Sequence, residues 1–526
     1  MKPTEDCQDR NTNETGTTAA TPTRRRFLRT LGAAGAAVAG APAAMNLLNA
    51  KAEAAAVRAV PRQWNETVDV LIVGSGFAGL CAAIEATSRG SKVLILEKMP
   101  IMGGNSIISG GGYNSWTDKL NLREKLKLGD DSVALHTVDT LKGGDYYNIP
   151  ELVKIFVEGA PATLNWMIDE GDLKLRPILS RIGGHSAFRG HTTMDGTGRG
   201  FIDVLQKISA KYGVAPIRMN TKVTWIWRQD PATPVLGVEV QTQRATRNIR
   251  INKALILAAG GFGRDIKMRQ MFNPNITAAY NCTNQPGATG EVLRCAQAVG
   301  ADALQMAFIQ LYPTADPESG VLDLYALYPG RAPMFGGLFV DVKGKRFVNE
   351  MERRDVVARA EIATGAKRAF SVFTAKMIPH ITMPEEVSQG VEAGRVWKAG
   401  SLAELAKKMD VPAAALQETI AKHNEYLRAG KDPEFSKPFT SHMLAIDEGP
   451  FYALAQWPAV HHCMGGLRIN TAAQVMDIWG DPIPKLYAAG EVAGGVHGAN
   501  RLGGNAIPTA MVFGRIAGTN AAKEKV

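Results

Sequence analysis

Cysteine is scarce in this chain of 526 residues, and the few cysteines are widely spaced. They are Cys7, Cys81, Cys282, Cys295 and Cys463, and no two of them form a C-x-x-C pair. This spacing excludes a disulfide scaffold, a four-cysteine zinc site, an attached c-type haem and a ferredoxin-type cluster. The sequence therefore contains no motif for a built-in metal-based electron carrier.

Charged residues and long apolar runs are also limited. Charged residues make up 21% of the chain and apolar residues 45%, which excludes a disordered protein. A net charge of +10 on so long a chain is weak evidence for nucleic-acid binding, and we expect no nucleic-acid partner. After residue 52 no run is apolar and long enough to span a bilayer, so we expect no stable membrane insertion of the mature chain.

Residues 1–52 are predicted to be an export signal. Residues 23–29 (TRRRFLR) resemble the twin-arginine motif, and an apolar but alanine- and glycine-rich stretch follows, with a small-residue cleavage site at residues 50–52 (AKA). A membrane anchor is the alternative, but alanine and glycine contribute little free energy of transfer into lipid. We therefore expect export through the twin-arginine pathway and a mature protein in the periplasm.

The first strong structural signal is a strand, a glycine-rich turn and a helix. Residues 67–73 (TVDVLIV) read as a buried parallel strand, residues 74–79 (GSGFAG) follow at once, and a second strand at 92–96 ends at Glu97. Glycines let the backbone approach a pyrophosphate at a helix N-terminus, and Glu97 can bind ribose hydroxyls. A merely structural glycine turn is the alternative, but it leaves Glu97 unexplained.

Two further strands run into glycine-rich turns, at residues 254–261 and 486–491, and residues 500–506 open a helix. The glycines within 103–112 would let a flat ring system lie against bare backbone. Such repeated junctions suit an extended FAD better than NAD. We predict non-covalently bound FAD in a Rossmann-like α/β domain built from both ends of the chain. The predicted cofactor-binding residues are Gly74, Gly76, Phe77, Ala78, Gly79, Glu97, Lys98, Gly104, Asn105, Ser106, Gly110, Gly111, Gly260, Gly261, Glu491, Gly504, Asn505, Ala506 and Ile507.

The middle of the chain differs in composition from its ends. It has clusters of proline, tyrosine and methionine, a β-like stretch at 337–347, and apolar residues at helical spacing in 402–406 and 416–426. We predict an inserted α+β capping domain, which would exclude water from the site when it closes. The predicted organisation is a signal peptide at 1–52, FAD-binding segments at 53–306 and 459–526, and the capping domain at 307–458.

Several motifs occur in an order that resembles a known family. With the glycine turn and Glu97, they are residues 103–106 (GGNS), 283–288 (TNQPGA), 344–350 (GKRFVNE), 461–466 (HHCMGG) and 497–505 (HGANRLGGN). From about residue 67 to the C-terminus the chain is similar to the flavoprotein part of soluble periplasmic fumarate reductases and of relatives that reduce urocanate, acrylate or methacrylate. These proteins belong to the fumarate reductase/succinate dehydrogenase superfamily.

The resemblance implies a mechanism and roles for particular residues. A hydride passes from N5 of reduced FAD to one carbon of an activated C=C bond, and an arginine, here Arg354, gives a proton to the other. One alternative assigns this role to Arg353. The other interprets Arg354 as a surface charge on a helix, paired with a carboxylate four residues away. An arginine has a pKa of about 12 or more, so it must be reprotonated promptly after each transfer. His461 and Arg501 match the residues that place positive charge on the substrate carboxylate, and His462 is the less favoured ligand. The alternatives are that His461 is a core histidine and that Arg501 contacts the flavin.

Two departures from the family bear on the substrate and on the proton supply. Where the fumarate enzymes have a Gln-x-His pair for a second carboxylate, this chain has Gln310 and Tyr312, so Tyr312 stands in place of the histidine. Urocanate reductases resemble this chain there. A phenol offers an uncharged hydrogen bond and an aromatic face, so Tyr312 suits a ring or a small apolar group better. The family's threonine-glutamate-x-x-arginine segment, which feeds protons to the acid, is not reproduced at 328–333. Arg331 is a candidate to replace part of it, and the proton path stays unassigned.

We predict an exported FAD-dependent oxidoreductase that reduces the C=C bond of an α,β-unsaturated carboxylate. Because the sequence holds no haem-attachment motif, we expect electrons from a separate periplasmic multihaem cytochrome c. Two alternatives stay open: a dehydrogenase that desaturates an acid or a cyclic ketone, and a flavin electron carrier without chemistry. No metal site is predicted, since His185 and His191 lack a second ligand at metal spacing. Cys463 beside His462 is not expected to be a catalytic pair, because neighbours in a strand face opposite ways.

Overall fold

The computed structural model describes residues 58–322 and 324–526, and the account here concerns the unit Val60–Val526. The predicted signal peptide, with its arginine motif and cleavage site, lies outside the described residues. Within the described ranges no helix combines the length and the apolar character that crossing a membrane requires.

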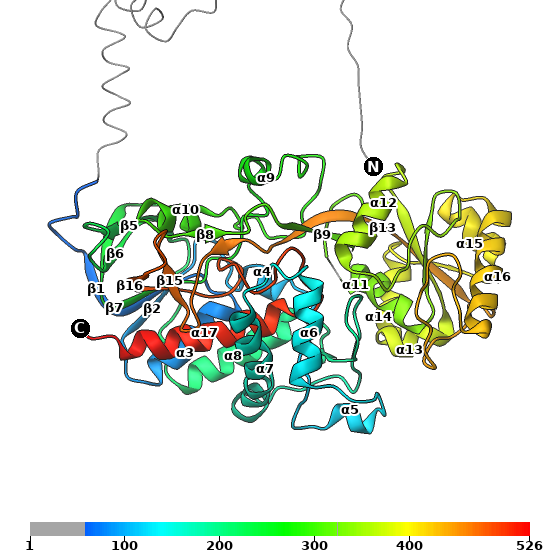
Figure 1. The fold of residues 1–526 in the computed structure, drawn as a ribbon, viewed down its shortest axis with the longest axis horizontal. Helices are drawn as coiled ribbons and strands as arrows, with labels where there is room; N and C mark the ends of the chain where they lie inside the picture. The colour runs from blue at the N-terminus through cyan, green and yellow to red at the C-terminus, as the bar shows by residue number, and fades with distance from the viewer. Residues whose placement is uncertain (1–57, 323) are drawn as a thin grey trace, which may run out of the picture. The chain divides into compact units, whose positions relative to one another are not determined.

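The fold is mixed α/β, as predicted, and its larger sheet joins strands from both ends of the chain (Figure 1). At its centre β1 (Glu66–Val73) pairs in parallel with β2 (Val93–Leu96) and β7 (Thr246–Leu257). On the other side of β7 lies β16 (Pro482–Ala488), also parallel. A parallel strand covered on both faces is apolar throughout, which is why β1 could be recognised in the sequence.

Three antiparallel strands extend the larger sheet. They are β5 (Lys222–Arg228), β6 (Val235–Gln241) and β15 (Gln474–Met476).

Helix α3 (Phe77–Thr87) begins at the glycine turn and packs against the C-terminal helix α17 (Ala506–Lys523), which runs beside it in Figure 1. The contact is close because α17 carries glycines there. A Cβ on Gly514 would lie 2.5 Å from the oxygen of Ala78, and one on Gly518 would lie 2.3 Å from the oxygen of Ala82. Helix α17, near the C-terminus, thus packs closely against α3, the helix that follows the first glycine turn.

A smaller antiparallel sheet forms in the segment predicted to be the capping domain. Its order is β10 (Leu338–Asp341), β11 (Ala369–Thr374), β13 (Phe451–Cys463) and β12 (Trp397–Ala399), and β9 (Ile309–Ala315) pairs with the far end of β13. The helices of this segment are α11 (Leu324–Arg331), α12 (Arg354–Ala363), α13 (Ile378–Ile381), α14 (Pro384–Glu392), α15 (Leu402–Met409) and α16 (Ala413–Ala429).

The predicted helices at 402–406 and 416–426 are present as α15 and α16, but the predicted strand at 337–347 is only partly right. It ends at Asp341, whose Oδ1 accepts hydrogen bonds from the backbone N–H groups of Lys343 (2.9 Å) and Lys345 (3.0 Å). Gly344 has a φ of 72°, which favours glycine, so the chain reverses in a tight turn.

Strand β13 runs across the predicted domain boundary between residues 458 and 459. Its first half pairs with β11 and β12, its second half pairs with β9, and its last residues include His461 and His462. The boundary itself stays a prediction. One continuous strand therefore connects the smaller sheet to the two histidines of the candidate site.

The remaining elements connect these parts. The helices are α4 (Gly104–Ile107), α5 (Leu122–Lys125), α6 (Val133–Gly143), α7 (Pro150–Gly171), α8 (Gly198–Lys211), α9 (Ile266–Phe272) and α10 (Glu291–Ala298). The short strands are β3 (Tyr113–Asn114), β4 (Gly190–His191), β8 (Ala303–Leu304) and β14 (Gly466–Leu467).

Candidate active site

The glycine turn after β1 forms part of the wall of a large cavity. Gly74 has a φ of +108°, and a Cβ there would lie 2.3 Å from the oxygen of Ala258, so only glycine fits. At the start of α3 the Phe77 N–H donates to Ser106 Oγ over 3.0 Å. The N-terminal end of α3 therefore borders the cavity, where its N–H groups favour an anionic group such as a phosphate.

Glu97 lies on the same wall, at the end of β2. Its Oε2 accepts hydrogen bonds from the hydroxyl (2.6 Å) and the N–H (3.2 Å) of Ser75, and its Oε1 accepts one from the Met99 N–H (2.9 Å). These bonds fix the carboxylate, and its remaining lone pairs can accept from ribose hydroxyls.

Lys98 belongs to a charged cluster on the cavity wall. Its Nζ lies 2.8 Å from Glu291 Oε2 and 2.6 Å from Thr289 Oγ1, while Lys222 Nζ lies 3.0 Å from Glu291 Oε1. Burial raises the pKa of Glu291, but its bonds to Lys98, Thr289 and Lys222 outweigh that effect and hold the pKa at about 2. The positive charge of Lys98 is thus matched within the protein.

Arg354 and Arg501 meet on one side-chain oxygen. Gln310 Oε1 accepts hydrogen bonds from Arg354 Nη1 (3.3 Å) and Arg501 Nη2 (2.9 Å). Neither guanidinium forms an ion pair with a carboxylate in the described part of the chain, and Nε of Arg501 is buried without any partner. Two neighbouring positive groups, neither of them in an ion pair, leave a place for an anion.

Desolvation acts on both of these arginines. It lowers the pKa of Arg354, while Tyr312 acts in the other direction. It lowers the pKa of Arg501 further, and the nearby positive charge of Arg354 adds to that effect. A bound carboxylate would relieve the repulsion, so the pair favours an anionic ligand in the cavity.

Tyr312 and His461 form the aromatic side of the same site. The Arg354 guanidinium lies 4.6 Å from the centre of the Tyr312 ring, and the Tyr312 and His461 rings are 4.9 Å apart. Thr283 Oγ1 lies 2.8 Å from His461 Nδ1 and so holds the orientation of the imidazole. The alternative in which Arg354 is a surface charge paired along its helix is therefore wrong.

The expectation that His461 contributes positive charge needs correction. Desolvation, and then the positive charges of Arg501 and Arg354, lower its pKa well below the usual value. The same holds for His462, whose Nδ1 lies 3.7 Å from Glu491 Oε1. Both imidazoles are neutral at pH 7, so the positive charge facing a substrate comes from the arginines.

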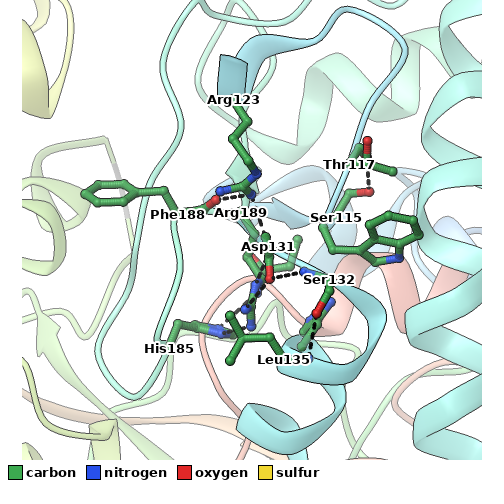
Figure 2. Close-up of polar contacts among 12 residues, drawn as sticks. Ser115, Thr117, Arg123, Asp131, Ser132, Leu135, His185, Phe188 and Arg189 are labelled. Carbon is green, nitrogen blue, oxygen red and sulfur yellow. Dashed lines mark hydrogen bonds and ion pairs between the residues drawn. The ribbon is translucent and has the colours of Figure 1, made fainter. Parts of the chain in front are cut away.

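A buried polar network surrounds Arg189 (Figure 2). Arg189 binds both carboxylate oxygens of Asp131 (2.8 and 2.9 Å), and its Nη1 donates to Asp139 Oδ2 (2.7 Å) and to His185 Nδ1 (3.1 Å). Since Nδ1 accepts, His185 donates from Nε2 to the oxygen of Gly503 (2.9 Å). A Cβ on Gly503 would lie 2.9 Å from Arg354 Nη2. Both ring nitrogens of His185 thus have partners within the protein.

The comparisons with known proteins decide the family. A model of the FAD binding domain matches residues 69–507. The chain belongs to the FAD-binding flavoproteins of the fumarate reductase type. This flavoprotein is 36% identical over 476 residues to the urocanate reductase of Eggerthella lenta, covering 89% of this chain and 76% of that protein.

Two more comparisons agree with this assignment. The flavoprotein is 36% identical over 517 residues to the acrylate reductase flavoprotein subunit of Shewanella woodyi, covering 94% of this chain and 97% of that protein. Its structure matches the open conformation of a flavocytochrome c3 fumarate reductase with a TM-score of 0.69 and 32% identity, covering 91% of this chain and 81% of that chain. The flavoprotein is thus an FAD-dependent oxidoreductase acting on CH–CH groups.

The residues on the cavity wall fit FAD. Gly260 leaves open space where a Cβ would stand, and Glu97 and the start of α3 offer groups for ribose and phosphate. The predicted cofactor residues on this wall are Gly74, Gly76, Phe77, Ala78, Glu97, Lys98, Gly104, Asn105, Ser106, Gly110, Gly111, Gly260, Glu491, Gly504, Ala506 and Ile507. The substrate residues Tyr312, His461, His462 and Arg501 share the cavity with Arg354.

Three predicted cofactor residues lie behind the wall instead. A Cβ on Gly79 would lie 2.0 Å from the oxygen of Gly74, and one on Gly261 would lie 2.5 Å from Glu491 Oε1. Asn505 is fully buried, and its Oδ1 accepts from Asn114 Nδ2 over 2.7 Å. These residues support the wall, and their contact with FAD stays a prediction.

Gln310 stands at the glutamine of the Gln-x-His pair, but it was not among the predicted site residues. It is buried, and its Nε2 donates to Asn500 Oδ1 (2.8 Å) and to the oxygen of Arg501 (2.7 Å), which fixes Oε1 toward the two arginines. Its place two residues before Tyr312 was a usable signal, because alternate residues of a strand share a face. Thr283 was missed as well, although it stands in a quoted motif.

Proposed function

We propose that this flavoprotein reduces the C=C bond of an α,β-unsaturated carboxylate. The observation that supports this is the meeting of Arg354 and Arg501 on Gln310, with the unpartnered Nε of Arg501 beside them. A substrate carboxylate would supply the missing negative charge and bind the guanidinium of Arg501 through two hydrogen bonds. A flavin electron carrier without chemistry has no use for such a pair.

The chain's own residues account for the rest of the reaction. FAD, when bound and reduced, supplies the hydride that the β-carbon accepts. As negative charge then builds up toward the substrate carboxylate, Arg501 stabilises that charge more strongly than in the ground state. Arg354 donates a proton to the α-carbon, and its desolvated position makes it a stronger acid than a free arginine.

Tyr312 supports a substrate whose second substituent is uncharged. It is 4% exposed, and the guanidinium of Arg354 and the neutral His461 border its ring. A phenol cannot neutralise a second carboxylate, whereas it packs well against a ring or a small apolar group. We therefore place urocanate-like and acrylate-like acids ahead of fumarate as substrates.

The cellular setting belongs to the proposal as well. The arginine motif at 23–29 supports export by the twin-arginine pathway, and the lack of a haem-attachment motif supports a separate multihaem cytochrome c as electron donor. Fractionation of a host that makes the full chain is the test of location. Recovery of the protein in the cytoplasmic fraction rather than in the periplasmic fraction would contradict the proposed export.

A substrate panel tests the proposed reaction. Flavin-loaded protein is mixed with reduced viologen dye and, in turn, with urocanate, cinnamate, acrylate, methacrylate and fumarate. We expect dye oxidation with at least one of the first four acids. No turnover with any member would overturn the proposal, and dye reduction by the saturated acids alone would favour the reverse direction.

A further inference from the structure

The turn at the end of α6 has a strained backbone. Asp145 and Tyr146 have φ values of 53° and 58°, in the left-handed region that favours glycine. Tyr146 is 71% exposed, so burial of its side chain does not explain this conformation. Strained turns persist where their surroundings hold them, and they are frequent at functional sites. The groups that hold residues 143–146, the α6 turn, therefore indicate what the turn does.

One side of the α6 turn is fixed to the segment that carries Arg501. The oxygen of Gly144 accepts a hydrogen bond from the Ala499 N–H over 2.9 Å. The oxygen of Gly143 accepts one from Asn500 Nδ2 over 3.2 Å. Both bonds use backbone oxygens of the turn, so they do not depend on the side chains of the turn.

The other side of the α6 turn is bound to Arg353, the residue before Arg354. Arg353 Nη2 donates to Asp145 Oδ2 over 3.1 Å, and its Nη1 donates to Asp145 Oδ1. Arg353 Nε and Nη2 also donate to the two carboxylate oxygens of Asp355, over 3.0 and 2.9 Å. The guanidinium is therefore held between two carboxylates, one on its own helix and one on the α6 turn.

Arg353 and Arg354 differ in their hold on a proton, although they are neighbours. The hydrogen bond to Asp145, and with it the bond to Asp355, raises the pKa of Arg353 against the lowering effect of burial. Desolvation instead lowers the pKa of Arg354, whose hydrogen bond goes to the amide oxygen of Gln310. Arg353 therefore keeps its proton, which argues against it as the acid and suits a residue that holds another one in place.

The start of α12 connects Arg353 to the site. Arg353 is the N-cap of this helix and Arg354 is its first residue, so a fixed Arg353 fixes the backbone of Arg354. The guanidinium of Arg354 in turn reaches the segment that follows Arg501, because a Cβ on Gly503 would lie 2.9 Å from Arg354 Nη2. The α6 turn is thus bonded to both chain segments whose arginines meet on Gln310.

An ordinary surface ion pair is the alternative, and such a pair contributes little to stability. The side chain of Asp145 is 48% exposed and that of Arg353 is 19% exposed. Glycine would adopt the left-handed backbone of residue 145 at a lower cost than aspartate does. The aspartate side chain makes its hydrogen bonds to Arg353, so this contact is what the strained position provides.

We propose that Asp145 positions Arg354 for proton transfer by holding Arg353, an inference that rests on the proposed function. Asp145 and Arg353 are positioning residues, and neither of them lines the cavity. Asp145 belongs to the predicted FAD-binding segment and Arg353 to the predicted capping domain, so the pair ties the acid to the part of the chain that binds the flavin. Loss of the pair lets the start of α12 shift, and a misplacement of about 1 Å can cost about 10²-fold in rate.

Asp145→Asn tests this role, because it removes the charge and leaves the backbone bonds of the α6 turn. The two half-reactions of the flavin are followed separately by stopped-flow absorbance: reduction by reduced viologen, and reoxidation by the best enoate of the panel. We expect reoxidation to slow about tenfold, since it requires the proton of Arg354. Reduction by the dye, and the KM for the enoate, should stay within about twofold of wild type because Arg501 and FAD are undisturbed.

Further variants keep the test decisive if asparagine disturbs the fold. Arg353→Gln should slow reoxidation at least as much, and the double variant should be no slower than Arg353→Gln, because both changes remove the same contact. Asp145→Glu retains the carboxylate and should recover part of the rate. Asp172→Asn is the matched control and should behave as wild type, since Asp172 is also left-handed (φ 56°) at a helix end and pairs with the exposed Lys174.

The failures of the two proposals are distinguishable. If wild type reduces an enoate but Asp145→Asn and Arg353→Gln are reoxidised at the wild-type rate, the positioning role is wrong and the proposed function stands. If both half-reactions of Asp145→Asn slow equally, or if Asp172→Asn slows reoxidation as much, the effect is a general one and the positioning role is again wrong. If wild type reduces no enoate, both proposals fall.

Discussion

Arg354 illustrates at the residue scale how surroundings change the chemistry of a side chain. It is the first residue of α12, it lies over the Tyr312 ring, and its hydrogen bond goes to an amide oxygen rather than a carboxylate. Desolvation lowers its pKa, so the guanidinium gives up a proton more readily than one paired with an acid. The same side chain on the helix surface would be an ordinary charge.

Arg354→Ala should remove substrate reduction while leaving FAD bound. General acid catalysis contributes about 10²- to 10⁴-fold, and we expect kcat to fall within or beyond that range. The measurement is dye-linked turnover together with the flavin absorbance spectrum. Arg359→Ala, at an exposed position of the same helix, is the control, and retention of a tenth of wild-type activity in Arg354→Ala would contradict the assignment.

Tyr312→His should shift preference toward a dicarboxylate. A histidine can take up a proton beside a second carboxylate, which a phenol does not do at neutral pH. We expect the ratio of kcat/KM for fumarate to that for urocanate to rise about tenfold, measured side by side with wild type. An unchanged ratio would show that Tyr312 does not select the substituent.

At the scale of elements, α12 and β13 carry the site and are joined by a buried polar contact. Glu361 on α12 accepts from Gln456 Nε2 on β13 over 3.0 Å, and both residues are completely buried. Oε2 of Glu361, Oε1 of Gln456 and the hydroxyl of Ser371 have no hydrogen-bond partner among the described residues. Burial raises the pKa of Glu361 well above its usual value, so the carboxyl group is held neutral.

This contact predicts a pH-dependent stability. The folded protein holds the Glu361 proton more tightly than the unfolded chain, whose pKa is 4.5, so the free energy of unfolding falls as pH rises above that value. The fall is up to about 1.4 kcal/mol per pH unit until the folded pKa is reached. Glu361→Gln cannot ionise, so its advantage in Tm over wild type should grow from pH 5 to pH 8.

Thermal unfolding followed by circular dichroism at several pH values checks this expectation. Glu418→Gln, at an exposed position on α16, gives the comparison for a glutamate without burial. A Tm difference between Glu361→Gln and wild type that does not vary with pH would contradict a buried neutral carboxyl group.

At the scale of the whole molecule, the FAD cradle is assembled from distant parts of the chain. The wall combines the turn after β1, Glu97 after β2, Gly260 after β7 and Glu491 after β16. All four strands are parallel neighbours in one sheet, so their carboxyl ends meet at one edge. Binding of FAD should therefore stabilise the fold as a unit.

Glu97→Ala should weaken the binding of FAD and therefore reduce the stability that FAD gives to the fold. Hydrogen bonds to a charged group contribute about 1.5–3 kcal/mol, so we expect the Kd for FAD to rise about 10- to 100-fold. Titration of deflavinated protein with FAD measures the Kd, and FAD at about a hundredfold excess over Kd should add about 2.7 kcal/mol to the free energy of unfolding of wild type. Glu170→Ala, away from the cavity wall, should leave the Kd unchanged.

Local patterns made much of this architecture predictable. A buried parallel strand followed by three glycines and an acid is a short-range signature, and the structure places Gly74, Gly76 and Glu97 on one cavity wall. The strand predicted at 337–347 was overextended, because the Asp341 turn depends on side-chain hydrogen bonds that an apolar pattern does not report. Gln310 could be aligned from its motif, but its role was not predicted, because that role depends on two arginines elsewhere in the chain.

The sequence by itself determined the α/β class, the FAD cradle and the family, since backbone turns and strand burial depend on neighbouring residues. Only the tertiary structure decided the chemistry of the site. Gln310 and Arg501 are 191 positions apart and meet through two hydrogen bonds, of 2.9 and 2.7 Å. The charge of His461 and the proton affinity of Arg354 follow from desolvation and from neighbours that are distant in sequence. Electrostatic energies depend on distance in space and on exclusion of water, and neither quantity is encoded in local spacing.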